Sequence, residues 1–215
     1  MEKSLKLSEK LFCLAVNPKK GGIFLNASSA LGMTLTGTVF MELLNKDLIT
    51  IQNKAVHLQK VAIQNDGIHE FFLNPIRRRE KDRKIRMWIL IFNVKNRRIQ
   101  KLFIRDLVRK GVLRTEERRI LFVPYEKVFL MDRALVDSIR KEVEEAALGI
   151  GNPTDESLLL AVMVAKTNLL TQIIPDRQRR KEAVANLKKL PESDISKAVR
   201  EAIQMVHTAI VYTAS

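Results

Sequence analysis

Basic residues are concentrated in one stretch of this 215-residue chain, and the chemistry they offer is anion binding. The segment from Arg77 to Arg119 holds 17 Lys/Arg against 5 Asp/Glu, so most of the chain's net charge of +14 lies there. Guanidinium and ammonium groups pair with phosphates and carboxylates. Clustering of this degree indicates a binding face for a polyanion, meaning nucleic acid, anionic lipid or an acidic protein, rather than general solubility.

Four of these cations lie near the start of an expected helix and form the candidate headgroup- or anion-binding site. Arg97, Arg98 and Lys101 fall within about one helical turn, where forked guanidinium groups can share one phosphate. Lys95 precedes them. We therefore expect these four side chains to contact the anionic partner.

Residues that could support catalysis or metal binding do not form a recognisable set. The histidines His57, His69 and His207 are far apart in the chain and have no metal-ligand spacing with each other or with Cys13. Phosphate-binding and dinucleotide-binding glycine patterns are absent from the sequence. Two pairs of adjacent glutamates lie among basic residues, which favours ordinary ion pairing. The sequence predicts a non-enzymatic protein with no catalytic residue, no metal and no cofactor.

The spacing of apolar residues predicts a mainly α fold, a single compact helical domain over residues 1–215 with several short β-hairpins. Ser8 and Thr154 are expected to cap helices, whereas Gly111 and Gly149 are expected to end them. The expected helices cover residues 8–15, 35–44, 99–108, 135–148, 155–170, 177–189 and a last one starting near Pro191. A short strand is expected at 23–25. Hairpins are expected at 48–58 and at 112–123, the second with its turn at 115–118.

Membrane-spanning and disulfide-bonded classes are disfavoured. Cys13 is the lone cysteine, so no intramolecular disulfide can form, and its apolar neighbours indicate a buried thiol. The first residues lack the apolar region of a signal peptide. The most apolar run, residues 158–165, is far shorter than the ~20 residues that cross a bilayer, so it predicts a buried helix. Any membrane contact is therefore expected to be peripheral.

Helix followed by hairpin occurs twice in this prediction, and that order is also found in winged-helix units. A winged-helix-like nucleic-acid-binding protein is therefore the alternative function. Against it, no set of Asn, Gln and Arg suited to base recognition stands out, and aromatic residues amount to 6%. Nucleic acid is thus the less favoured partner.

Several segments, taken in order, resemble the Golgi phosphoprotein 3 family. The stretch 7–15 followed by Lys20-Gly21 is similar to the family's opening helix and turn. The segments 35–43, with Gly37 and Glu42, and 88–90, with Trp88, resemble two later helices. The most specific match is the block 107–121, which contains Gly111, and 158–165 resembles the central apolar helix. The chain is thus identified as a divergent or prokaryotic-type member.

The resemblance implies a function and a location. Eukaryotic members bind phosphatidylinositol 4-phosphate and hold cytoplasmic tails of membrane proteins. Anionic membrane lipid and such tails are therefore the expected partners, on the cytoplasmic face of a membrane, and an oligomer is compatible with the family. The family's headgroup residues fall near Ala27 and on Thr36, Arg97 and Gln100 here, so that Arg97 alone retains its charge.

Overall fold

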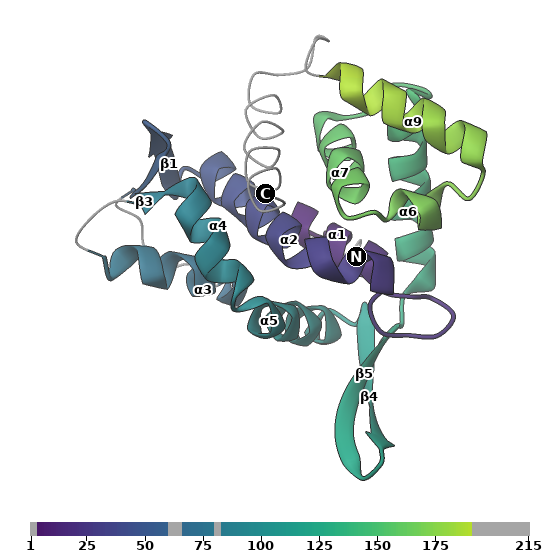
Figure 1. Ribbon diagram of the computed structural model, residues 1–215, viewed down its shortest axis with the longest axis horizontal. Helices are drawn as coiled ribbons and strands as arrows, with labels where there is room; N and C mark the ends of the chain where they lie inside the picture. Colours follow the sequence, from purple (N-terminus) through teal and green to yellow (C-terminus); the bar gives the residue numbers. More distant parts are fainter. Residues whose placement is uncertain (1–3, 60–65, 80–82, 191–215) are drawn as a thin grey trace.

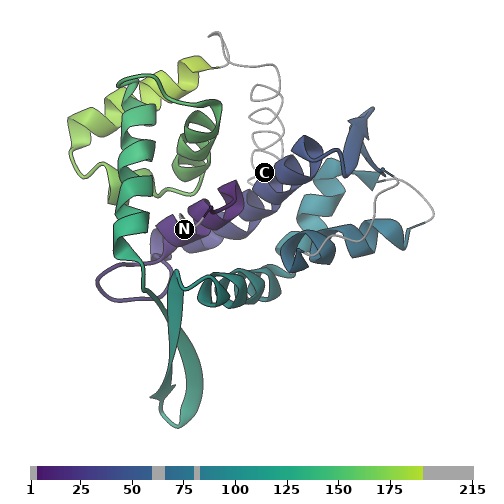
Figure 2. The same ribbon diagram turned by 180° about the vertical axis from the view of Figure 1, so that it is seen from behind.

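The computed structural model describes residues 4–59, 66–79 and 83–190, which fold around two central helices (Figure 1). These are α1 (Leu7–Ala15) and α2 (Leu25–Asn45). Helices α3 (Gly67–Arg77), α4 (Ile85–Asn93) and α5 (Asn96–Arg109) cover one side of this pair. The other side is covered by α6 (Arg133–Leu148), α7 (Asp155–Lys166), α8 (Leu170–Ile173) and α9 (Arg177–Lys189), as the view from behind also shows (Figure 2). The predicted mainly α fold with short hairpins is confirmed. The boundaries 1–215 stay a prediction.

Helix α2 is longer than the sequence indicated. It begins at Leu25 rather than at residue 35, and the strand expected at 23–25 is reduced to one bridge between Ile23 and Val16. The polar residues before residue 35 do not end the helix, because their hydroxyl groups bond to its own backbone: those of Ser28 and Thr34 donate to the carbonyls of Leu25 and Ala30.

By length and composition α2 could cross a membrane, and among the described helices it is the one that meets this test. However, 67% of its apolar window is buried inside the fold, and it packs against α1, α4, α5 and α7. This burial is typical of the core helix of a globular protein.

Helix α1 does not start as predicted. Ser8 lies inside the helix and is fully buried, whereas Lys6 occupies the N-cap position, where its backbone N–H donates to Glu9 Oε2 at 2.9 Å. The prediction of a Ser8 cap was wrong because the helix starts earlier, at Leu7, so that Ser8 is its second residue and Lys6, held by Glu9, takes the cap position. The Thr154 cap is confirmed, since its Oγ1 accepts from the Ser157 N–H at 3.1 Å.

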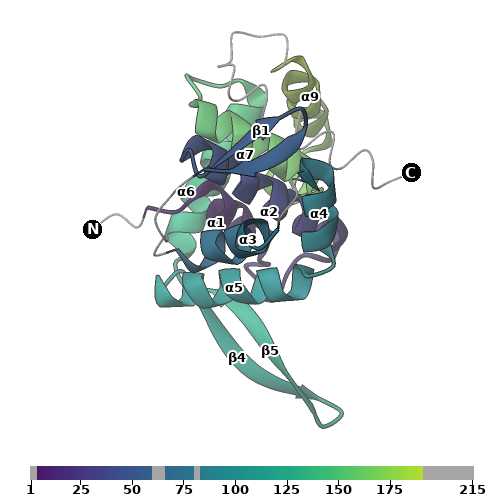
Figure 3. The same cartoon turned by 90° about the vertical axis from the view of Figure 1, so that its left-hand side faces the viewer.

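The first hairpin is confirmed and the second is corrected. Strands β1 (Ile49–Gln52) and β2 (Ala55–Leu58) pair as expected and are joined by the short strand β3 (Arg83–Lys84). Strands β4 (Leu113–Ile120) and β5 (Val123–Leu130) are eight residues each and turn at 121–122, not at 115–118. The polar segment expected to turn is therefore part of a strand, and the hairpin projects from the helical body (Figure 3).

Glycines 111 and 149 end α5 and α6 with φ of 65° and 68°. This agrees with the prediction, which rested on the ability of glycine to adopt the left-handed conformation without strain. Helix α7 ends at Lys166 rather than at residue 170, because Asn168 adopts a positive φ of 57° before α8 begins. The last predicted helix, beginning near Pro191, lies outside the described residues.

The core is continuous across both halves of the molecule. The central apolar segment 158–164 is buried along its whole length, as predicted from its lack of a polar side. Trp88 and a group of phenylalanine rings fill the space between α2, α3 and α4, with Phe72 and Phe92 centroids 4.3 Å apart. Cys13 is fully buried in α1.

Candidate functional site

The outer side of α5 carries five exposed cations, which we call the α5 face. Helical spacing places them within about one third of the helix circumference. Helix α5 lies along the lower edge of the helical body, at the base of the hairpin (Figures 1 and 3). The structure thus brings together three residues named from the sequence and adds two more. The members of the α5 face are Arg97, Arg98, Lys101, Arg105 and Arg109.

The inner side of α5 fixes the position of this face. Ile99, Phe103 and Leu107 are fully buried, and the ring of Phe103 stacks on Phe12 of α1 with centroids 5.4 Å apart. At the start of the helix Asn96 packs against Gly32, where an added Cβ would meet the Asn96 side chain at 2.5 Å. These contacts make α5 part of the core rather than a loose surface helix.

Within the part of the chain that the structure describes, four members of the α5 face have no ion-pair partner. The fifth member, Arg109, bonds to Asp106. The four without an ion-pair partner among the described residues are Arg97, Arg98, Lys101 and Arg105. The neighbouring Lys110 faces inward and contacts both oxygens of Glu9 at 2.6 and 2.7 Å. Like charges gathered without acidic partners repel one another, so the face has a free-energy cost that an anionic partner would relieve.

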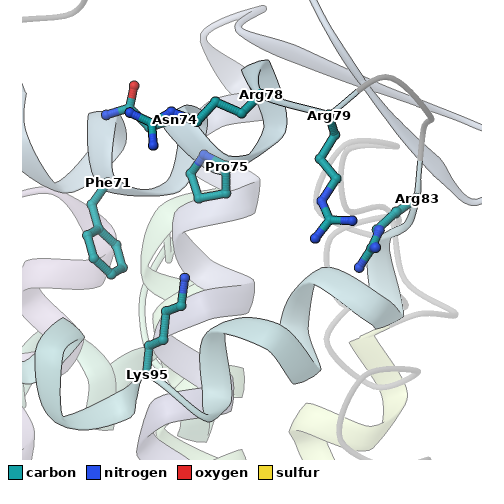
Figure 4. A pocket seen from close by; sticks show the side chains of 7 residues that line it. All are labelled: Phe71, Asn74, Pro75, Arg78, Arg79, Arg83 and Lys95. Atoms are coloured by element: carbon teal, nitrogen blue, oxygen red, sulfur yellow. The ribbon is translucent and has the colours of Figure 1, made fainter.

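Lys95 does not share the α5 face, although the sequence grouped it with the other three. Its ammonium nitrogen lies 5.9 Å from the centroid of the Phe92 ring and borders a separate pocket of about 870 Å³ (Figure 4). We call this the α3–α5 pocket, because residues of α3, of the segments that follow it, and Lys95, which directly precedes α5, line it. Its lining residues are Phe71, Asn74, Pro75, Arg78, Arg79, Arg83 and Lys95.

Sequence reasoning did not find this pocket. Its arginines belong to the basic segment, but nothing local shows that the end of α3 faces the residue before α5. The α3 helix itself was not predicted. Asp66 caps it by accepting from the N–H groups of Ile68 and His69 at 3.0 and 3.2 Å, and an Asp-Gly pair before an apolar run was the available signal.

The tip of the β4–β5 hairpin is apolar and exposed. Leu121 and Phe122 are 88% and 95% exposed, with φ of 46° and 71°. Nearer the base, the guanidinium of Arg114 lies 4.8 Å from the centroid of the Phe129 ring, and Arg118 and Lys127 approach the same ring. Glu116 pairs with both arginines, so this part of the hairpin is largely neutralised.

The transferred family positions are not arranged as a binding site. Ala27 and Thr36 are fully buried, and the Thr36 hydroxyl donates to the carbonyl of Gly32 at 2.8 Å. Gln100 donates to Asn96 Oδ1 at 3.1 Å. Of this set, Arg97 is the residue that stands exposed on the α5 face.

The arrangement of ionisable side chains offers no catalytic centre among the described residues. His69 contacts Glu42 and Asp66, but the imidazole is fully buried and Glu42 is nearly so, which leaves no route for a substrate. In the described part of the chain no group of three or more His, Cys, Asp or Glu side chains could hold a metal ion.

Comparison with known proteins defines the class of this fold. A family model described as Golgi phosphoprotein 3 (GPP34) matches residues 7–206, and the chain therefore belongs to that family. No curated protein matches the chain. The resemblance found in the sequence is thereby confirmed. The family is not known as an enzyme family and suggests a Golgi-associated function.

Proposed function

We propose that this protein is a peripheral membrane protein that binds anionic phospholipid headgroups on the cytoplasmic face of a membrane. The observation that supports this most strongly is the α5 face, where four cations stand together without acidic partners among the described residues. An exposed row of cations along one side of a helix fits a negatively charged layer, because its members can approach the layer together. The family match agrees with a lipid-binding adaptor.

The strength of such binding follows from the number of cations. Each basic residue near an anionic leaflet contributes about 1 kcal/mol, so the four unpaired members of the α5 face would supply about 4 kcal/mol. That corresponds to a dissociation constant of roughly 1 mM, which is weak and reversible. Salt would weaken it further, since the screening length is about 8 Å at physiological ionic strength.

The hairpin tip offers a second contribution of a different kind. Transferring a phenylalanine side chain out of water contributes about 1.5–3 kcal/mol, and both tip residues are exposed in the free protein. The hairpin projects on the side of the molecule where α5 lies (Figure 3). Charge would therefore attract the protein to the surface, and the apolar tip would slow its release.

The lipid suggested by the family resemblance is phosphatidylinositol 4-phosphate, which we include as the headgroup to test. The α5 face contains one counterpart of the family's headgroup residues, Arg97. By itself the face is therefore expected to respond to the negative charge of the membrane rather than to a particular headgroup. Acidic segments in the tails of membrane proteins would meet the same cations and are candidate partners in an adaptor role.

Vesicle flotation tests the proposal. The wild-type protein is expected to float with phosphatidylcholine vesicles that contain phosphatidylglycerol, and much less with phosphatidylcholine alone. The triple variant Arg97→Gln, Lys101→Gln, Arg105→Gln should bind roughly 100-fold more weakly, since three cations contribute about 3 kcal/mol. A control with the same charge change on α9, at the opposite side of the molecule, is Arg177→Gln, Lys181→Gln, Lys189→Gln (Figure 1). Equal recovery with both vesicle types would refute the proposal.

The geometry gives less support to nucleic-acid binding. On α5, Asn96 and Gln100 bond to each other and are half-buried, so the helix presents cations but no amide for reading base edges. A gel-shift titration with duplex DNA at several salt concentrations compares the two functions. Tighter binding to duplex DNA than to anionic vesicles at the same salt concentration would favour the alternative.

A further inference from the structure

The α3–α5 pocket combines cations from three separate segments of the chain. Arg78 and Arg79 follow the end of α3, Arg83 lies in β3, and Lys95 precedes α5. Figure 4 shows the guanidinium groups of Arg79 and Arg83 turned toward each other, with the ammonium of Lys95 pointing toward Pro75 across the pocket. Cations brought together in this way by tertiary folding are arranged around one volume, unlike a row along a single helix.

These cations are not neutralised by the described residues around them. Of three consecutive arginines, Arg77 makes two bonds to Glu70, with Nη1–Oε2 at 2.5 Å and Nη2–Oε1 at 3.1 Å. By contrast Arg78, Arg79 and Arg83 have no ion pair with any residue that the structure describes, and none of the seven described lining residues is acidic. Among the residues that the structure describes, the pocket is therefore lined by four positive charges and no negative one, a combination that a bound anion would stabilise.

The shape and lining of the pocket indicate the class of anion. Two guanidinium groups facing one space can donate several parallel N–H bonds to the oxygens of one phosphate. A phosphate monoester carries up to two negative charges near neutral pH, with its second pKa near 6, and so gains more from four cations than a singly charged diester. Phe71 and Pro75 add an apolar wall, and about 870 Å³ is room for a small organic body as well as its phosphate.

We propose that the α3–α5 pocket binds the phosphate monoester group of a small organic phosphate, either free in solution or displayed as a lipid headgroup. The lipid source rests on the proposed membrane function, whereas the free source does not. In this arrangement the α5 face responds to total surface charge, and the pocket distinguishes a terminal phosphate from a bridging one. The pocket uses none of the exposed members of the α5 face, so the two can be separated by substitution.

The test uses the full chain, two vesicle compositions and one soluble probe. Vesicles of phosphatidylcholine with phosphatidic acid, a monoester, are matched in zeta potential to vesicles with phosphatidylglycerol, a diester. The wild type should bind the phosphatidic acid vesicles about tenfold more tightly, a gain typical of one or two charge-assisted hydrogen bonds. Arg79→Gln with Arg83→Gln should abolish this preference. The control pair Arg133→Gln with Lys181→Gln, which removes two exposed cations elsewhere, should keep it.

The soluble probe separates the two sources of the phosphate. Glycerol 3-phosphate should bind the wild type and the α5-face triple variant equally in a calorimetric titration, and should bind the Arg79→Gln, Arg83→Gln variant at least about tenfold more weakly. If vesicles do not bind but glycerol 3-phosphate does, the proposed membrane function fails and the pocket remains. Equal affinity of wild type and pocket variant for both glycerol 3-phosphate and phosphatidic acid vesicles would overturn the inference.

Discussion

The imidazole Nε2 of His69 on α3 lies 2.8 Å from the carboxylate Oε2 of Glu42 on α2, in a part of the core that is almost closed to water. The other oxygen of Glu42 accepts the backbone N–H of Ser8 at 2.7 Å. One carboxylate therefore joins α1, α2 and α3. Because each of these groups has lost most or all of its contact with water, the free energy of unfolding depends on all of the contacts being made together.

Replacement of Glu42 by alanine should destabilise the fold strongly. It leaves the imidazole of His69 and the N–H of Ser8 buried without this acceptor, so we expect a loss of about 3–5 kcal/mol in the free energy of unfolding. Urea unfolding followed by the fluorescence of Trp88, which is 2% exposed, measures it. Glu145→Ala, at a half-exposed carboxylate of α6, should change the value by less than about 0.5 kcal/mol. Similar losses for both variants would contradict the assignment.

Asp66 should make stability depend on pH in the acid range. Burial opposes its ionisation, but the hydrogen bond and charge of Lys6, whose Nζ lies 2.6 Å from Oδ2, lower the pKa of Asp66 to about 2. A lowered pKa stabilises the folded state above the unfolded-state value of 3.8, and this contribution of about 2 kcal/mol disappears as the pH falls from 3.8 to 2.

Asp66→Asn isolates this charge, because asparagine is an equally good helix N-cap. The variant should be less stable than wild type at pH 6, and the difference should vanish near pH 2 in urea titrations. A difference that stays constant between pH 6 and pH 2 would show that the carboxylate charge is not involved.

Gly21 and Gly22 provide a matched pair for testing how the hairpin is anchored. Both have positive φ, 69° and 73°, but an added Cβ at Gly21 would lie 2.5 Å from the ring of Phe129 and 2.8 Å from the carbonyl oxygen of Val128, whereas one at Gly22 meets nothing within 4 Å. Gly22→Ala should cost about 1–2 kcal/mol from backbone strain alone. Gly21→Ala should cost about 1–3 kcal/mol more, since overpacking is added. Equal costs in urea unfolding would mean that the loop does not pack on the hairpin.

The hairpin tip should affect membrane binding but not folding. Phe122→Asn removes the exposed ring and keeps a residue that tolerates positive φ, so the free energy of unfolding should change by less than about 0.5 kcal/mol. Binding to anionic vesicles should weaken by about 10- to 100-fold if the ring enters the bilayer. Phe122→Leu, which stays apolar, should bind almost as wild type. Unchanged flotation of Phe122→Asn would leave the α5 face as the binding element.

Local signals in the sequence sufficed for several elements. Gly111 and Gly149 end helices because glycine takes the left-handed conformation without strain, and the hairpin at 48–58 follows from its turn residues. The α5 face could also be foreseen in part, since Arg97, Arg98 and Lys101 share a side of any helix through them. These features depend on neighbours a few residues apart.

The errors came from features that depend on distant contacts. The β4–β5 turn falls on Leu121 and Phe122, two residues that disfavour positive φ, because the pairing from Leu113–Leu130 to Ile120–Val123 leaves no other residues for it. The α3–α5 pocket escaped notice for a similar reason. It exists only where residues 71–79 and Arg83 come close to Lys95, and no local sequence pattern predicts that contact.

The buried thiol of Cys13 can report the transient separation of the helices around it. Burial raises the pKa of this thiol, and the side chain is fully enclosed in α1 between the two halves of the fold. A thiol in that state reacts only when the surrounding helices separate, because the thiolate is the reactive form. The rate at which an alkylating reagent modifies Cys13 in the native protein therefore measures how often the central helices separate. No label has to be introduced for this measurement.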